Sequence, residues 1–270
     1  MHILALLPLF ASAALAATPE PPPPPPVVRL VAREYAFEAP PRMVGGVKRF
    51  RLVNRGTQPH YARFFRLEDG KTLADFAELR ERGRGSAEWL TPAGGIAPVA
   101  PGDSMDLVAS LPPGRILVIC GYPGADGRPH VDHGMMREFF VGSPPRLPVT
   151  EPGEELTLRL ADGALTWSAP PTAGRRTILV ENTGTRPHQA LLSRLPAGKS
   201  LADEKAWFEQ GFRTARPGAP AGGVIELPPG QRVWVTLDLR PGRYALLCHI
   251  TGQPGHSHFE QDEAVEFTVR

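Results

Sequence analysis

Short stretches of alternating apolar and polar residues, separated by Pro-Gly pairs, recur along most of the chain. The clearest are SMDLVASL at residues 104–111 and RVWVTLDL at residues 232–239, each with a Pro-Gly pair on both sides. Alternation with a period of two predicts β-strands that bury one face. Further strands are predicted at residues 49–54, 116–120, 138–141, 177–182, 244–248 and 264–269. The pattern therefore predicts an all-β protein.

Two short helices are predicted to interrupt the strands at equivalent places. Thr72 and Ser200 each stand three residues before an aspartate, Asp75 and Asp203 respectively. This spacing is close to that of a capping box, in which the side chains at both positions satisfy free backbone N–H groups at the start of a helix. We expect one helix-bearing insert in each half of the chain.

The chain aligns with itself at an offset of 128 residues, without a gap from residue 54 to residue 141. NRGTQPH at residues 54–60 matches NTGTRPH at residues 182–188, and Cys120 matches Cys248. A repeating unit of more than a hundred residues is a domain and not the short module of a solenoid. The sequence thus predicts two tandem copies of one domain.

Proline-rich and apolar segments mark the ends of these copies. The run ILALLPLFASAALAA at residues 3–17 has the shape of a secretory signal peptide, with an uncleaved anchor as the alternative. An exported protein in the periplasm or outside the cell is expected, with no transmembrane segment in the mature chain. The predicted segments are a signal peptide at 1–17, a stiff Pro-rich spacer at 18–26, domain 1 at 27–143, a Pro-rich linker at 144–153 and domain 2 at 154–270.

Composition narrows the choice of fold and partner. Lys+Arg 30 against Asp+Glu 28 leaves a net charge of +2, which gives no reason to expect nucleic acid or an anionic membrane surface as a partner. Gly 28 and Pro 32 are the counts expected of many turns between short strands. We therefore expect each copy to be a Greek-key β-sandwich.

Three residues that can bind a metal recur in both copies. They are a histidine after an early strand, a cysteine at the end of a late strand, and a histidine ten residues further on. In the first copy these are His60, Cys120 and His130, followed by Met135. This arrangement resembles the cupredoxins, the blue-copper family. The resemblance implies a type 1 copper site in which His60 and His130 are nitrogen ligands, Cys120 is the thiolate and Met135 is the weak axial thioether.

Copper sites of this type serve one-electron transfer, and the resemblance implies exchange with a redox protein partner through an exposed histidine edge. The gap between Cys120 and His130 is longer than in small electron carriers and is similar to the loop of copper nitrite reductases. An enzyme of that kind needs a second, histidine-lined site, for which His133 and His249 are the spare imidazoles. The first expectation is an electron carrier or copper-binding protein and not an enzyme.

The residues also permit interpretations without metal. Each histidine could be a turn residue bonded to the backbone, and each cysteine a small buried hydrophobe. A disulfide between Cys120 and Cys248 is a further alternative in an exported protein. Under these interpretations the chain would be a metal-free binding or structural module of the cell envelope that kept the fold.

The second copy departs from the pattern. Strict register gives His188, Cys248 and His258 as ligands, with Glu263 in the place of the axial methionine. A shifted register uses His256 with Gln261 at the axial position. A carboxylate is harder than a thioether, so a standard blue site is not expected there, and a different metal or a lost site are both open.

Overall fold

A computed structural model describes residues 22–145, 148–250, 257–261 and 263–270. The predicted signal peptide, the first residues of the spacer and His256 lie outside these ranges. Pro26 leads directly into the first strand, and its carbonyl accepts a hydrogen bond of 2.9 Å from Arg49 N. Within the described ranges, no helix combines the length and the apolar character needed to cross a membrane. The domain boundaries predicted at residues 143 and 154 stay a prediction.

The first repeat contains nine strands, one α-helix and one 3₁₀ helix. In chain order they are β1 (Val27–Arg33), β2 (Ala36–Glu38), β3 (Arg42–Met43), β4 (Gly46–Asn54), β5 (His60–Leu67), α1 (Leu73–Glu81), β6 (Leu90–Val99), β7 (Ser104–Leu111), β8 (Gly114–Ile119), η1 (His130–His133) and β9 (Met136–Val141).

The described part of the second repeat follows the same order with one strand fewer. Its elements are β10 (Leu156–Ala161), β11 (Ala164–Trp167), β12 (Gly174–Asn182), β13 (His188–Leu195), α2 (Leu201–Glu209), β14 (Ala219–Leu227), β15 (Arg232–Leu239), β16 (Gly242–Leu247), η2 (His258–Gln261) and β17 (Ala264–Val269). The strands and helices predicted from the sequence are all present.

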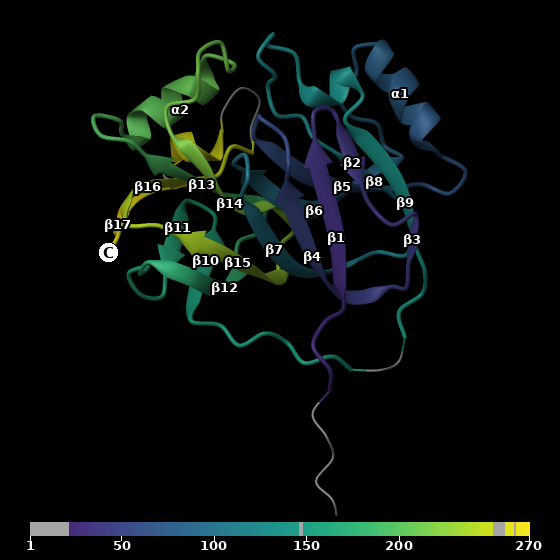
Figure 1. Cartoon of the computed structure of the whole chain (residues 1–270), viewed down its shortest axis with the longest axis horizontal. Helices are drawn as coiled ribbons and strands as arrows, with labels where there is room; N and C mark the ends of the chain where they lie inside the picture. Colours follow the sequence, from purple (N-terminus) through teal and green to yellow (C-terminus); the bar gives the residue numbers. More distant parts are fainter. Residues whose placement is uncertain (1–21, 146–147, 251–256, 262) are drawn as a thin grey trace, which may run out of the picture.

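Strands of both repeats join into two continuous sheets that pack face to face (Figure 1). One sheet has the order β11-β10-β12-β15-β7-β4-β1-β2, and the other has the order β17-β16-β13-β14-β6-β5-β8-β9-β3. In the first repeat the chain changes sheet on both sides of β3, between β4 and β5, between β6 and β7, and between β7 and β8. This crossing pattern is that of a Greek-key β-sandwich, as predicted.

The two repeats meet strand to strand about a pseudo-twofold axis. In one sheet, Leu107 of β7 pairs with Val235 of β15, which is its own equivalent at the offset of 128. In the other sheet, Ile96 of β6 pairs with its equivalent Val224 of β14. Pairing of equivalent residues defines an isologous contact, the kind made by two copies in a symmetric dimer.

A buried carboxylate holds this junction from one side. Asp106, whose side chain is 2% exposed, accepts hydrogen bonds from Arg51 at 2.6 and 2.8 Å and from Arg175 of the second repeat at 3.2 Å. Burial opposes ionisation, but the hydrogen bond and charge of Arg51 outweigh it and lower the pKa of Asp106. The ion pairs therefore link the two repeats while Asp106 stays charged.

The two helices lie at the same end of the sandwich (Figure 1). Each begins with the predicted cap, since Asp75 accepts hydrogen bonds from the N–H and hydroxyl of Thr72 at 2.9 and 2.8 Å, and Asp203 does the same for Ser200. Trp207 of α2 is 4% exposed and packs into the core, as expected for an insert that covers the sandwich.

Candidate metal centre

Three donor atoms of the first repeat converge in the protein interior. His60 begins β5, Cys120 follows the last residue of β8, and His130 begins η1. His60 Nδ1 lies 3.1 Å from His130 Nδ1, and Cys120 Sγ lies 3.9 and 3.5 Å from these two nitrogens. All three residues are fully buried. The sequence therefore predicted correctly which side chains the fold brings together.

The Asn-x-Gly motif before β5 positions the first histidine. Asn54 Oδ1 accepts a hydrogen bond of 2.8 Å from Gly56 N, while its Nδ2 donates to the carbonyls of Gln58 and Val99 at 2.8 and 2.9 Å. A Cβ atom on Gly56 would lie 2.6 Å from His60 Nε2, closer than unbonded atoms approach. Glycine is required here because the turn runs directly against the imidazole.

Both imidazoles have an oxygen atom behind Nε2. His130 Nε2 lies 3.3 Å from Gln58 Oε1, while His60 Nε2 lies 3.4 Å from Glu34 Oε1 without hydrogen-bond geometry. An oxygen acceptor behind Nε2, as at His130, favours the tautomer with hydrogen on Nε2, which leaves the Nδ1 lone pair free. The two Nδ1 atoms lie 3.1 Å apart, an arrangement that a shared cation would stabilise.

Burial sets the protonation of the donors. It raises the pKa of the Cys120 thiol to about 12, against a smaller lowering by the N–H of Tyr61, which lies 3.4 Å from the sulfur. Burial, together with the neighbouring His60, lowers the pKa of His130 to about 4. At neutral pH the imidazoles are uncharged and ready to coordinate, and cation binding would supply the energy to deprotonate Cys120.

The donor triangle has the size that a transition metal needs. Edges of 3.1, 3.5 and 3.9 Å enclose a point about 2 Å from each donor atom, which matches typical metal–nitrogen and metal–sulfur distances in proteins. Two imidazoles and a thiolate in a trigonal arrangement are the donors of a blue-copper site. The residues present therefore fit copper.

Met135, the predicted axial ligand, is fully buried in the same core cluster as Cys120. Its carbonyl accepts a hydrogen bond of 3.1 Å from Cys120 N, and its N–H donates to His130 O at 3.0 Å. The backbone thus ties Met135 to both neighbouring donors. Its role as the axial ligand stays a prediction.

The prediction that the edge of one histidine is exposed is wrong. His60 and His130 are both 0% exposed. The ring of Tyr35, which is partly exposed, lies edge-on to His130 with centroids 5.1 Å apart. The nearest aromatic route from this site to the surface is therefore Tyr35 and not an imidazole.

The second repeat gathers four donors in the equivalent place. Glu263 Oε2 lies 2.8 Å from His188 Nδ1 and 3.0 Å from His258 Nδ1, and Cys248 Sγ lies 3.5 Å from the latter. One ligand atom from each of the four residues lies within 4.8 Å of the others, and all four residues are buried. These four residues are those of the strict register.

The shifted register stays a prediction, because its residues are not described. His256 lies outside the described residues, and nothing is described of the Gln261 side chain, whereas His258 and Glu263 both face the cluster. Both cysteines are free, so Cys120 and Cys248 form no disulfide with each other.

The spare imidazoles are not brought together. His133 stacks on Tyr35 with ring centroids 4.4 Å apart, and His249 stacks on Phe208 at 4.2 Å. Neither belongs to the two donor clusters found among the described residues. The second site expected of a nitrite-reductase type of enzyme is thus not formed by these two histidines.

Glu34 and Asp162 are the site residues that sequence reasoning missed. Asp162 Oδ1 lies 3.0 Å from His188 Nε2, so it stands behind this histidine as Glu34 stands behind His60. The two carboxylates are 128 residues apart. Extending the internal alignment from residue 54 towards the N-terminus would have found them.

No family model matches the chain, and neither does any curated protein. Among solved structures, a reduced auracyanin from Roseiflexus castenholzii is similar to 44% of this chain over 98% of its own, with 18% identity and a TM-score of 0.31. The McoA multicopper oxidase of Aquifex aeolicus is similar to 91% of this chain over 66% of its own, with 13% identity and a TM-score of 0.28. The copper-containing nitrite reductase of Thermus scotoductus has 13% identity and a TM-score of 0.25, with 90% and 60% covered.

The strand order and donor geometry of the chain itself agree with the resemblance seen in the sequence, because a Greek-key sandwich gathers two histidines and a cysteine from the predicted positions.

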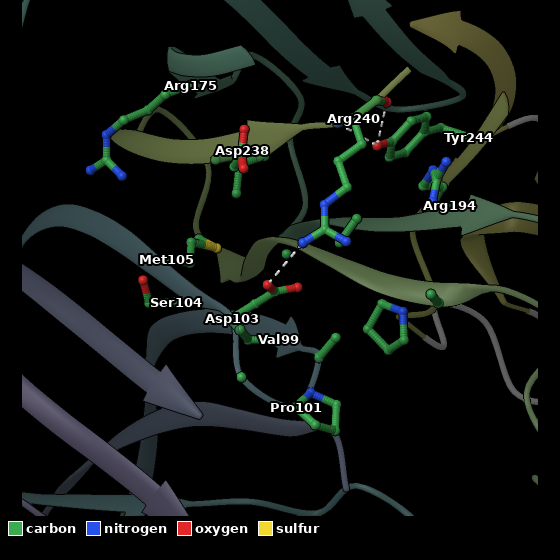
Figure 2. A pocket seen from close by; sticks show the side chains of 17 residues that line it. Val99, Pro101, Asp103, Ser104, Met105, Arg175, Arg194, Asp238, Arg240 and Tyr244 are labelled. Carbon is green, nitrogen blue, oxygen red and sulfur yellow. Dashed lines mark hydrogen bonds and ion pairs between the residues drawn. The ribbon is translucent and has the colours of Figure 1, made fainter. Parts of the chain in front are cut away.

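A cavity of about 430 Å³ opens at the junction of the two repeats, away from both clusters. Arg240 Nη2 lies 3.3 Å from Asp103 Oδ1 across it, and Tyr244 OH bonds to the backbone of Arg240 (Figure 2). Arg175, which also lines it, pairs with Asp106. None of the predicted ligands lines the cavity.

Proposed function

We propose that this protein is an exported copper protein that transfers single electrons through a type 1 site in the first repeat. The observation that carries the proposal is the buried triangle of His60 Nδ1, His130 Nδ1 and Cys120 Sγ, whose corners surround a point about 2 Å from each. The low identity and TM-scores of the copper proteins named above do not add to this support.

When bound, copper would supply a one-electron Cu(II)/Cu(I) couple. Gln58 Oε1, 3.3 Å from His130 Nε2, would keep the Nδ1 lone pair of that histidine inward, and the Glu34 carboxylate lies 3.4 Å from His60 Nε2. The N–H of Tyr61 donates to Cys120 Sγ and stabilises the thiolate form. Because the β-strands fix these groups, little rearrangement accompanies a change of charge. Tyr35 contacts His130 and reaches towards solvent, so a redox partner would dock over Tyr35.

Cys120→Ser tests the site directly. The full chain titrated with Cu(II) should develop an intense visible thiolate-to-copper band, and the variant should lose both the band and tight copper binding at the first repeat. Cys248→Ser is the matched control, since it removes the equivalent sulfur of the other repeat and should keep the band. If Cys120→Ser retains the band of the parent protein, copper is not held as proposed.

Export is part of the proposal and rests on residues 1–17, whose apolar run ends in small residues. The mature protein isolated from the periplasm or the culture medium should lack this segment. Mass spectrometry of the intact chain measures its removal. Cytoplasmic accumulation of the full-length chain would contradict export.

A further inference from the structure

The second repeat keeps the histidines and the cysteine of the first but presents a carboxylate to them. We propose that His188, Cys248, His258 and Glu263 form a separate site for a divalent cation of the zinc type, which does not change its oxidation state. The inference goes beyond the proposed electron transfer, because it concerns a different metal in a different repeat.

Four donors of three kinds meet there. Glu263 Oε2 lies between the two imidazoles, at 2.8 Å from His188 Nδ1 and 3.0 Å from His258 Nδ1. Cys248 Sγ lies 3.5 Å from His258 Nδ1 and completes the group. Zinc in proteins takes four ligands drawn from cysteine, histidine and carboxylate, and a site closed by four protein ligands is typically structural.

The surroundings orient each donor, as expected of a built metal site. Asp162 Oδ1 lies 3.0 Å from His188 Nε2, so the hydrogen of that imidazole is directed outwards and Nδ1 inwards. Gln189 N donates to Cys248 Sγ at 3.2 Å. Gly163 N donates to the second oxygen of Glu263 at 3.1 Å, which leaves Oε2 to face the cluster.

A count of charges distinguishes the two repeats. In the second repeat, the donors include a thiolate and a carboxylate, whose two negative charges a divalent cation neutralises and a monovalent Cu(I) does not. Arg186 Nη2 lies 3.6 Å from the outer oxygen of Glu263, but its side chain is 36% exposed, so solvent screens this pair. In the first repeat, a thiolate with neutral imidazoles and Met135 carries one, which Cu(I) neutralises. Because all these residues are buried, an uncompensated charge is costly. The second site therefore favours a permanent divalent ion over the Cu(I) half of a redox couple.

Cobalt(II) provides the test, because it replaces zinc and gives a thiolate-to-metal absorption band. The full chain carrying Cys120→Ser, which lacks the sulfur of the first repeat, should bind one equivalent of Co(II) with such a band. Zn(II) should displace it, and Cu(I) held by a competing chelator should displace it at least tenfold less effectively. Adding Cys248→Ser to the same chain should abolish the band.

Glu263→Gln, which removes the charge and keeps the shape, should weaken Co(II) binding at least tenfold, and Glu263→Met should reverse the preference in favour of Cu(I). Since Glu263 is buried, circular dichroism checks that each variant folds. Asp162→Asn, at a side chain 32% exposed, is a second variant that should weaken binding without touching a donor.

The inference is overturned if the Cys120→Ser chain gives no Co(II) band and no rise in melting temperature with Zn(II). The carboxylate would then stand in the place of the metal, held by hydrogen bonds from both imidazoles. It is also overturned if Cu(I) displaces Co(II) as well as Zn(II) does. Copper binding by the Cys248→Ser chain is measured separately, so failure of this site and failure of the proposed electron carrier are distinguishable.

Discussion

Removal of the Glu34 side chain should weaken copper binding at the first repeat without removing a ligand. Glu34 Oε1 lies 3.4 Å from His60 Nε2 and also accepts hydrogen bonds from the backbone N–H groups of Thr57 and Gln58. Glu34→Ala therefore removes the carboxylate that faces the imidazole and leaves the turn before β5 without its acceptor. Both changes act on the position of one donor.

The expected loss of copper affinity depends on how exposed the Glu34 side chain is. Loss of an outer partner of a metal ligand typically costs 10- to 100-fold in affinity, or roughly 1 to 3 kcal/mol. The Glu34 side chain is 28% exposed, so solvent screens part of its charge and we expect a value near the middle, about 30-fold. Burial acts to raise the pKa of Glu34, but the N–H groups of Gln58 and Thr57 outweigh it and lower the pKa to about 2. The effect should thus be constant from about pH 5 to pH 8.

The assay is a competition titration of Cu(I) and Cu(II) against a chromophoric chelator, with thermal unfolding measured in parallel. Glu34→Gln keeps an oxygen acceptor and should restore the stability but only part of the affinity. Asp162→Asn makes a similar change in the second repeat and should leave copper affinity at the first unchanged. Equal copper affinity in Glu34→Ala and the parent chain, or an equal loss in Asp162→Asn, would refute the assignment of Glu34 as a positioning residue.

Two further changes test the site and the junction. Gly56→Ala should lower copper affinity at least tenfold by titration, because its Cβ would lie 2.6 Å from His60 Nε2, while Gly184→Ala should disturb only the second cluster. Asp106→Asn should cost about 2 kcal/mol in denaturant unfolding at pH 7, less than for a fully buried pair because Arg51 is 41% exposed. The pKa of Asp106 is lowered from 3.8 in the folded protein, so its contribution to the free energy of unfolding is present above pH 3.8 and is lost as the pH falls through the folded pKa. If the parent chain and Asp106→Asn differed in stability by the same amount at pH 3 as at pH 7, the reasoning would be contradicted.

The features that could be predicted from the sequence are those marked by a local or repeated pattern of residues. Alternation predicted strands such as β7 and β15, and the offset of 128 predicted that His60, Cys120 and His130 have counterparts that occupy equivalent places. Thr72 and Asp75 predicted the start of α1, because a capping box is a contact between residues three apart.

Features that depend on contacts between distant segments could not be predicted in this way. The sharing of both sheets arises from pairs such as Leu107 with Val235, and no local pattern marks which edge of a strand finds a partner. The burial of His130 was missed because its ring is surrounded by residues from distant segments, among them Tyr35. Glu34 matches Asp162 at the offset of 128, but that match alone does not say that its carboxylate lies 3.4 Å from His60.

The pairing of equivalent residues across the junction has a consequence for how such a chain can be divided. Each repeat on its own would expose two open strands, β6 and β7 or β14 and β15, whose unpaired N–H and C=O groups are templates for other strands. Because residues on the pseudo-twofold axis face their own equivalents, such a half-molecule already carries the surface that complements a copy of itself. A single repeat would therefore persist as a homodimer, and covalent fusion of two such subunits is what frees one donor cluster to change while the other is retained.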